Sequence, residues 1–523
     1  MSNDNSGLIA DALVKTQPIM SLSMDVEDTY RTWIKQQGAK VSLYRDYERG
    51  NHRSGITTQM RKMLRLPNDD TGMNDFNDSY CAVIIDKMSG RLHVTEISTS
   101  NDTAPNDDKL WLNPILEYNH WTALQGTTFR GAIRDGDSFV MVDPETLAWT
   151  SEAAYDGYSG MFALFENNTS TPYWACRIWS EASEADQKEV MRVVVYETDK
   201  VSYWRGEEGG NELRPDNIVS LEEVRRLGGE VIVPAGADIK NTFQNYRPWP
   251  VSMLPIIHFV NKYDNYSDSG ESELRPAISL QDVLNRTLHS MVMASEFSAF
   301  SILWAKGIAI DVNGIVPGAV INLLLKDSAG NLIDPSPEAT AFLQAVAVGQ
   351  FQGSDISQYT GQIDKIVREI SQATQTPIYG ITSQGAISGE ALKQLEIGLI
   401  GKCERFQRQN EDAVRSLIKL TAEIQSVFKT EYKGVNPPII NAVQVSWKSP
   451  EILDVTAQIN ALKDLRRDCP GLWSDEWYRA KIGGLLGMSQ SDIKTEGENA
   501  KSESQFKTDL ITGGGDSGTP TFV

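Results

Sequence analysis

Histidine and cysteine, the side chains that most often bind metals or act in catalysis, are few and widely spaced in this sequence. They are His52, His93, His120, His258 and His289, and Cys81, Cys176, Cys403 and Cys469. No histidine pair has the HxH or HExxH spacing of a zinc-dependent hydrolase. No CxxC pair exists, so neither a zinc site nor a disulfide framework is indicated, and we expect reduced, partly buried thiols.

One serine lies in a pattern typical of a nucleophile. The stretch Gly515-Asp516-Ser517-Gly518-Thr519-Pro520 has the residue order found around the reactive serine of chymotrypsin-like proteases. That mechanism needs the serine beside a histidine and a buried aspartate inside a closed barrel. Ser517 instead lies in a glycine-rich stretch near the C-terminus, so we interpret the match as accidental and predict no catalytic residue.

Two acidic clusters have the oxygen ligands that a divalent cation prefers. They are Asn68-Asp69-Asp70 and Asn106-Asp107-Asp108. Asn and Asp also favour turns for backbone reasons, and surface turns are the interpretation that we prefer. The sequence has no GxxxxGK[ST] phosphate loop, so it does not resemble an ATPase motor. We therefore predict no metal and no cofactor.

The charge of the chain limits how it deals with nucleic acid. Its 523 residues carry a net charge of −21, with 40% hydrophobic and 23% charged residues. A protein that grips DNA along its phosphates needs Lys and Arg to replace counterions, so this balance argues against a conventional DNA binder. It does not exclude a protein past which DNA slides. The length predicts two to four modules.

Targeting signals are absent from the sequence. The segment Met1–Asn5 lacks the positive charge of a secretion signal. The longest apolar candidate, Gly307–Leu325, is broken by Asp311, Asn313, Pro317 and Asn322. We expect a soluble, cytoplasmic product with no membrane segment.

The first half of the chain predicts mixed helix and strand after a lead-in at residues 1–23. A helix is indicated from Val26 onward, and β-branched runs at Ser138–Val142 and Arg192–Tyr196 predict strands. Proline residues between Arg247 and Pro255 end this region.

Long helices dominate the middle of the chain. Pro276–Lys306 has no internal Gly or Pro and predicts one uninterrupted helix. Gly307–Pro337 carries β-like segments, at Ile308–Ile310 and Ala319–Leu325. A second helix is expected over Asp355–Thr376, and its apolar residues follow a heptad pattern that predicts lengthwise packing. They are Ile356, Tyr359, Ile363, Ile366, Ile370 and Ala373.

The rest of the chain predicts a loop, a third long helix and a smaller helical part. Pro377–Ile387 is rich in Gly, Ser, Thr and Gln, and a helix is expected from Ser388 to about Phe428. A strand at Val443–Trp447 and helices within Pro450–Gly487 follow. Residues from Thr495 onward have the composition of a disordered tail.

Two long helices that flank a β-containing insert, then a loop and a third long helix, form an unusual order. It is similar to that of the portal proteins of tailed double-stranded DNA bacteriophages. Five local stretches also resemble that family. They are Leu43–His52 with its Y-x-x-Y-x-x-G-x-H spacing, Asn74, Asn77 and Tyr80 followed by Val83–Asp86, the apolar stretch Leu254–Asn261, Ser272-Glu273-Leu274, and Ser388-Gly389-Glu390-Ala391-Leu392-Lys393.

The resemblance implies an α+β, portal-like subunit with a wing, a two-helix stem, a β-containing clip, a long spine helix and a helical C-terminal crown. The implied parts are a flexible N-terminal segment (1–25), the wing (26–275), the first stem helix (276–306), the clip (307–354), the second stem helix (355–376), the channel loop (377–388), the spine helix (389–430), the C-terminal wing or crown region (431–494) and a disordered tail (495–523).

The stretch that resembles the channel loop contains no charged residue. It is Ile378, Tyr379, Gly380, Ile381, Thr382, Ser383, Gln384 and Gly385. A neutral loop that faces DNA neither traps phosphates nor repels them strongly, which suits sliding. By composition alone an ordinary connector between helices is the simpler interpretation, and the position between stem and spine favours the channel.

The resemblance further implies a structural subunit that is made in the host cytoplasm and forms a ring of twelve copies at one vertex of a capsid. The ring would be the channel for DNA packaging and ejection, within the virion. The implied partners are double-stranded DNA, terminase, scaffold or major capsid protein, and neck or adaptor proteins. The alternative is a cytoplasmic enzyme that processes nucleic acid or sugar and carries a helical insertion. It would need convergent carboxylates or a histidine pair, which no spacing singles out.

Overall fold

A computed structural model describes most of the chain. It covers residues 4–16, 24–52, 77–100, 107–165, 171–182, 189–231, 233, 238–263, 269–299, 303–306, 337, 347–350, 355–378, 389–430, 437, 440, 442–451, 455–469 and 474–485. The chain divides into two compact units, Met1–Pro450 and Glu451–Val523. The second unit contains α12 (Val455–Asp468) and α13 (Asp475–Leu485).

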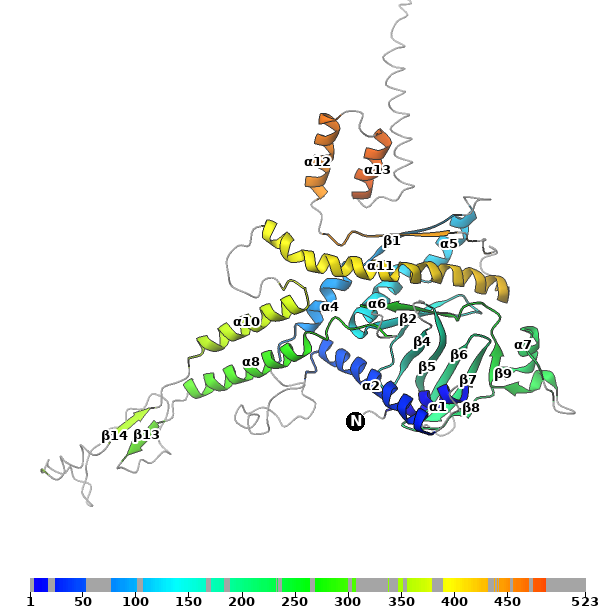
Figure 1. Cartoon of the computed structure of the whole chain (residues 1–523), viewed down its shortest axis with the longest axis horizontal. Coiled ribbons are helices and arrows are strands. Elements are labelled where there is room, and N and C mark those ends of the chain that lie inside the picture. The colour runs from blue at the N-terminus through cyan, green and yellow to red at the C-terminus, as the bar shows by residue number, and fades with distance from the viewer. Residues whose placement is uncertain are drawn as a thin grey trace, which may run out of the picture. The chain divides into compact units, whose positions relative to one another are not determined.

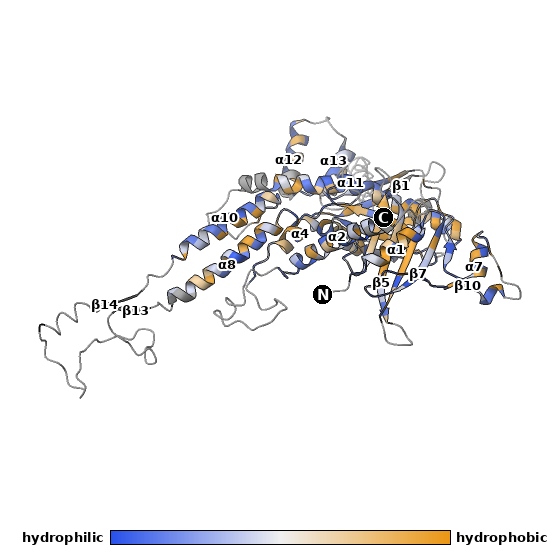
Figure 2. Cartoon of the chain, turned by 60° about the horizontal axis from the view of Figure 1, so that its bottom comes forward, coloured by the Kyte–Doolittle hydropathy of each residue, from blue (hydrophilic) through white to orange (hydrophobic). Residues whose placement is uncertain are grey.

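The largest sheet of the first unit is antiparallel and has the strand order β11-β7-β6-β5-β4, with β8 paired to β7. Its strands are β4 (Gly160–Phe165), β5 (Pro172–Ala182), β6 (Glu189–Glu197), β7 (Lys200–Glu207), β8 (Arg214–Pro215) and β11 (Tyr246–Pro248). Alternate residues of β5 and β6, such as Trp174 and Val193, are fully buried. Figure 2 shows the hydrophobic colour concentrated on these strands.

Helix α1 (Ser6–Thr16) packs on the large sheet. Leu8, Ile9 and Leu13 are fully buried in one cluster with Trp174 and Val193. The indole N–H of Trp174 donates to Thr16 Oγ1 over 2.8 Å. We expected a flexible segment over residues 1–25, and that prediction is wrong for 6–16. An isolated helix of this length is marginal in water, so its order depends on the sheet beneath it, which the local sequence does not show.

A second sheet has the order β12-β2-β3 and lies against several helices. Its strands are β2 (Asp137–Val142), β3 (Trp149–Ala153) and β12 (Ile256–Val260). Helix α6 (Trp121–Asp135) lies against this sheet, and α2 (Met24–Glu48), α4 (Cys81–Ser89) and α5 (Asp107–Tyr118) contact α6. Small elements complete this part: β9 (Val219–Ser220), α7 (Leu221–Arg226), η2 (Ile239–Asn241) and β10 (Phe243–Gln244).

Phe129 of α6 is the centre of the main core. Its ring centroid lies 5.8 Å from Phe259 of β12, 5.5 Å from Phe406 and 5.4 Å from Trp447. Phe406 belongs to α11 (Gly389–Phe428), and Trp447 ends β15 (Ala442–Trp447), which pairs antiparallel with β1 (Val94–Ser100). Aromatic contacts of this geometry stabilise the packing beyond the area they bury.

A pair of long helices leaves this core. The chain runs out along α8 (Ile278–Ala299) and returns along α10 (Ser357–Ala373), and the two lie side by side (Figure 1). Strands β13 (Leu303–Lys306) and β14 (Ala347–Gln350) pair antiparallel at the far end of the helices.

The predicted long helices are confirmed in kind, and one boundary is wrong. We expected a single helix over 276–306, but the helix ends at Ala299 and Leu303–Lys306 form a strand. The sequence has no Gly or Pro at the point where the helix ends and the strand begins. The strand is specified by its pairing with residues about forty positions later, which the local sequence does not show. The β-containing insert therefore begins at residue 303 at the latest, before the expected 307.

Other predictions have separate outcomes. The third helix was expected to end near Phe428, and α11 ends there. The expected strand at 443–447 is confirmed as β15. The expected region 431–494 is divided, since β15 belongs to the first unit and α12 and α13 to the second. The β-like segments 308–310 and 319–325, and the tail with Ser517, lie outside the described residues.

None of the helices in the described part of the chain is long and apolar enough to cross a membrane.

Candidate functional site

The candidate site is the α8–α10 helical pair with the parts that attach it to α11 and to the sheets. The predicted packing residues of α10 lie at different depths. Ile370 is fully buried, Ile363 and Ile366 pack half-buried against the core, and Ile356 and Tyr359 are half-buried. Ala373 is exposed, whereas Val367 is buried and was not predicted. A straight helix drifts from a strict heptad, which brings an i+4 position such as Val367 toward the core.

Most of the predicted channel loop lies outside the described residues. Ile378 is the exception, and it packs half-buried against the main core. Of the predicted spine motif, Ser388 lies outside the described residues, and Gly389, Ala391, Leu392 and Lys393 lie in the first turns of α11. The structure therefore describes the residues on either side of the predicted loop, up to Ile378 and from Gly389 onward.

A buried ammonium group joins the two ends of the helical pair to α11. Lys402 of α11 donates to Glu273 Oε2 over 2.8 Å, to the carbonyl of Thr374 over 2.6 Å and to Thr376 Oγ1 over 3.0 Å. Glu273 precedes α8, and Thr374 and Thr376 follow α10. The side chains of Lys402 and Glu273 are 4% and 1% exposed, so water contributes almost nothing to solvating this pair.

Electrostatics keep the Glu273 carboxylate ionised. Burial alone would raise its pKa, but the charges of Lys402 and Lys262 outweigh burial and lower the pKa below its ordinary value. Lys262 Nζ lies 3.2 Å from Glu273 Oε1, and Asn261 Nδ2 donates to the same oxygen over 3.3 Å. Every oxygen of the carboxylate is thus paired, which a buried charge requires.

The turn after α10 contacts α11 at a second point. A Cβ added at Gly398 would lie 3.0 Å from the Cβ of Gln375, a tight contact that would require Gln375 to shift. Gln375 has a φ of 49°, and the hydroxyl of Ser371 donates to the carbonyl of Thr376 over 2.7 Å. The turn is therefore held by its own hydrogen bonds and by α11.

Asn410 attaches α11 to the strand before α8. Its Oδ1 accepts from the backbone N–H of Val260 and its Nδ2 donates to the carbonyl of Val260, both over 2.9 Å. Val260 is the last residue of β12, an edge strand, and Asn410 is fully buried. The amide thus satisfies both backbone groups at the end of that edge.

The base of α8 is held by three polar side chains on one stretch of the helix. Gln281 accepts from the backbone N–H of Tyr80 over 3.0 Å and donates to the carbonyl of Asp78 over 2.6 Å. Asn285 Oδ1 accepts from the N–H of Asp78 over 3.0 Å. Asp282 Oδ1 accepts from the hydroxyl of Tyr47 over 2.5 Å. The bonds of Gln281 and Asn285 pair backbone groups of Asp78 and Tyr80, which precede α4 and have no partner within that helix.

The tyrosine–glycine–histidine spacing noted in the sequence belongs to this base. Gly50 has a φ of 80°, which a glycine adopts readily, and the turn brings His52 back toward α8. His52 Nε2 lies 3.2 Å from the carbonyl of Tyr47, and His52 Nδ1 lies 2.9 Å from Asn285 Nδ2. A carbonyl only accepts, so Nε2 carries the proton and Nδ1 accepts from the amide.

Burial lowers the pKa of His52, and this outweighs the hydrogen bond to Tyr47 and the negative charges of Asp282 and Asp78. His52 is therefore a neutral structural group that links α2 to α8.

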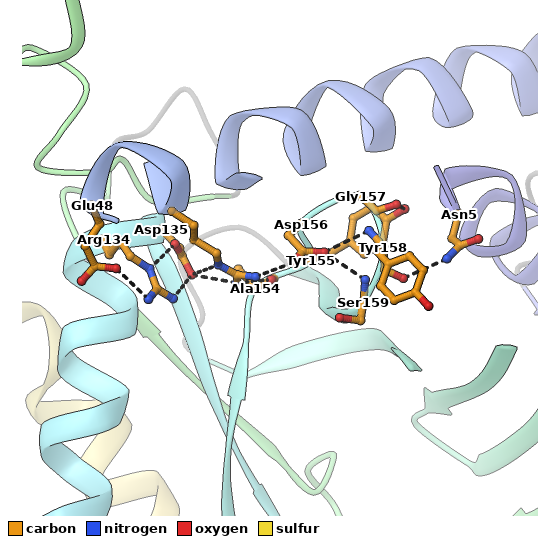
Figure 3. Close-up of polar contacts among 11 residues, drawn as sticks. Asn5, Glu48, Arg134, Asp135, Ala154, Tyr155, Asp156, Gly157, Tyr158 and Ser159 are labelled. Atoms are coloured by element: carbon orange, nitrogen blue, oxygen red, sulfur yellow. Dashed lines mark hydrogen bonds and ion pairs between the residues drawn. The ribbon is translucent and has the colours of Figure 1, made fainter. Parts of the chain in front are cut away.

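An ion-pair network fixes α2, which carries Tyr47. Arg45 donates to Asp135 Oδ2 over 2.9 Å, to Asp156 Oδ2 over 2.6 Å and to the carbonyl of Ala154 over 2.7 Å. Figure 3 shows Arg134 between Glu48 and Asp135, and Asp156 beside the backbone of Tyr158 and Ser159. The network joins α2 to α6 and to the turn between β3 and β4.

No cluster of three or more His, Cys, Asp or Glu able to hold a metal ion occurs among the described residues. His258 is sandwiched between Phe139 and Phe165, with centroid distances of 5.0 Å and 4.4 Å, and its Nε2 lies 2.8 Å from Asp137 Oδ1. Asn68-Asp69-Asp70, Asn106 and Ser517 lie outside the described residues. The buried polar contacts of this site hold the helices in fixed positions relative to one another.

Sequence reasoning singled out some of these residues without their roles. Glu273, Tyr47, Gly50 and His52 lay in stretches noted for their resemblance to a family, whereas Lys402 was missed. A lysine in an amphipathic helix ordinarily faces solvent. The one sign in the sequence that Lys402 is buried is that it lies beside the apolar residues Cys403 and Phe406.

Comparisons with known proteins identify the family of this chain. A family model described as "Phage portal protein, SPP1 Gp6-like" matches residues 80–503, and the chain belongs to this family. The matched range includes the helical pair, the loop and α11.

A solved structure described as "Neck of empty GTA particle computed with C6 symmetry" is also similar. The sequence identity is 11%, the TM-score is 0.32, and the match covers 77% of this chain and 88% of the other. No curated protein matches the chain. Membership of the portal family makes the chain a structural component of a virion, and the enzyme alternative has no support from it.

Proposed function

We propose that this chain is the portal subunit that forms a ring at one capsid vertex and serves as the channel for DNA packaging and ejection. The observation that carries the proposal is the family match over residues 80–503, which spans α8, α10, the loop 377–388 and α11. In this proposal α8 and α10 are the stem, the residues between them the clip, and α11 the spine of the wing.

The anchoring of the stem supports a mechanical role. Lys402 ties α11 to Glu273 before α8 and to Thr374 after α10, Asn410 ties α11 to β12, and Asn285 ties α8 to His52. A subunit that forms a channel wall must hold these helices in one arrangement while a charged polymer moves past. Identical chains close such a ring through head-to-tail contacts.

Charge supports a channel that does not hold DNA. The segment Pro377–Ser388 contains no Asp, Glu, Lys or Arg. A ring of twelve chains with a net charge of −21 each would carry −252. An acidic wall repels the phosphate backbone and keeps it from adhering, while a neutral loop leaves its passage free.

The proposed partners are double-stranded DNA in the channel, terminase, scaffold or major capsid protein, and neck or adaptor proteins. The chain would be made in the host cytoplasm and incorporated into the capsid, without ATPase or peptidase activity of its own.

Electron microscopy of the purified chain tests the ring. We expect particles with a central hole and rotational symmetry, with a mass near 700 kDa for twelve chains of 58.1 kDa. Monomers or dimers at every protein and salt concentration would contradict the proposal, and a small oligomer without a hole would favour an enzyme.

A replacement of residues 311–334 by a short Gly/Ser linker tests the clip. We expect rings to assemble, because these residues lie between the helices of the stem, and motor docking to fail. The control replaces residues 183–188, between β5 and β6, with the same linker and should package normally. If the clip variant packages DNA with its terminase, the clip assignment is wrong.

A further inference from the structure

A single ammonium group is shared by three segments that are far apart in the sequence. Lys402 has three N–H donors, and three acceptors surround it: Glu273 Oε2, the Thr374 carbonyl and Thr376 Oγ1. Glu273 is 129 positions and Thr374 28 positions from Lys402. All donors are therefore used: one points to the segment before α8 and two point to the turn after α10.

Packing alone does not explain this choice of residue. Apolar side chains of similar volume often replace a buried ion pair without loss of stability. Leu399, Cys403 and Phe406 already provide a fully buried apolar face on the same helix. What an ammonium adds is direction, because its hydrogen bonds constrain the positions of three acceptors at once.

The constrained segment is the one from which the loop starts. Thr374 and Thr376 lie directly before Pro377 and Ile378, the first two residues of the loop 377–388. The close approach of Gly398 to Gln375 and the bond from Ser371 to Thr376 hold the same turn. The start of the loop is thus tied to α11, whereas the loop itself contains no charge.

We propose that Lys402 is a positioning residue: it fixes the point where the loop 377–388 leaves α10 relative to α11, so that the two move together. As far as the loop is a channel loop, this rests on the proposed function. The linkage itself is a property of one subunit.

Distances between two spin labels within one subunit test the proposal. Thr382→Cys places one label in the loop and Arg408→Cys places the other at an exposed position of α11, after Cys469→Ser removes the exposed cysteine. Labelled subunits are diluted among unlabelled ones, so that each measured distance belongs to a single chain.

Four variants separate positioning from stability. Lys402→Met leaves Glu273 buried without this partner, and we expect a broader distance distribution and a lower melting temperature. Lys402→Met with Glu273→Leu removes both charges, so stability should recover while the distribution stays broad. Thr376→Val keeps the ion pair and removes one acceptor, and we expect a smaller broadening. Arg415→Met removes a guanidinium whose ion pairs among the described residues are with Glu411 and Asp412 of the same helix, and nothing should change.

The outcomes distinguish a positioning role of Lys402 from a contribution to stability alone. A distribution as narrow in the double variant and in Thr376→Val as in the parent would overturn the positioning role. If the double variant does not fold, Thr376→Val alone decides by the same criterion. Failure of the proposed function appears elsewhere, as a parent protein that forms no rings. If the double variant and Thr376→Val keep the narrow distribution of the parent in rings that still pass DNA, the positioning role is refuted and the proposed function stays intact.

Discussion

Replacement of Asn285 by leucine measures how strongly the base of α8 is held. Leucine has nearly the same volume, so the change removes hydrogen bonds with little change in packing. Asn285 is 1% exposed, and it bonds to the N–H of Asp78 over 3.0 Å and to His52 Nδ1 over 2.9 Å. Both partners would be left without this bond.

The expected loss follows from the burial of those partners. A buried polar group without its partner costs about 1–3 kcal/mol. His52 is 6% exposed and should lie within that range, whereas Asp78 is exposed, so its N–H should lie at the lower end. We expect Asn285→Leu to lower the free energy of unfolding by about 2–4 kcal/mol. The bonds of Gln281 remain and should keep α8 attached.

Urea denaturation at a fixed subunit concentration gives the measurement. The midpoint should fall while the slope stays the same, because the folded surface is unchanged. Arg286→Leu is the matched control, since Arg286 is the exposed neighbour on the same helix and should change stability by less than about 0.5 kcal/mol. A loss below about 1 kcal/mol for Asn285→Leu would show that these bonds do not hold α8.

Three further predictions concern other parts of the chain. Leu8→Ala should cost about 2–5 kcal/mol in the same assay, because Leu8 is fully buried beneath the sheet; no loss would mean that α1 is not docked. Melting temperature should fall as the pH drops below about 6.5, because the lowered pKa of His52 makes the unfolded chain bind the proton more readily; His52→Gln should reduce this dependence, and an unchanged profile would contradict it. Thr382→Lys with Ser383→Lys should make rings retain DNA at low salt, less so at high salt, with the melting temperature unchanged; a lower melting temperature with normal packaging would rule out the channel loop.

Local patterns in the sequence were sufficient for the long helices. The run from Gly389 to Phe428 has no proline and keeps helical periodicity, so its extent was predictable from residue types alone. The same holds for β2, β6 and β15, whose β-branched runs were recognised. These elements depend on the preferences of neighbours within a few residues.

Elements specified by distant partners were not predictable in this way. Residues 303–306 continue a helical pattern in the sequence, and their pairing with 347–350 makes them a strand. Residues 6–16 resemble a lead-in until the sheet that buries Leu8 and Leu13 is in place. In both cases the free energy comes from contacts that close a long loop, and the local sequence contains no record of them.

The candidate site shows the same division. Tyr47, Gly50, His52 and Glu273 stand out in the sequence as a resemblance, but their types alone suggest no task. Lys402 does not stand out at all. Its role exists only because the fold brings Glu273 and the turn after α10 to within 3.0 Å of its ammonium group and excludes water from all of them. A lysine becomes a structural cation through its surroundings, since burial makes an unpaired charge too costly and leaves pairing as the stable arrangement.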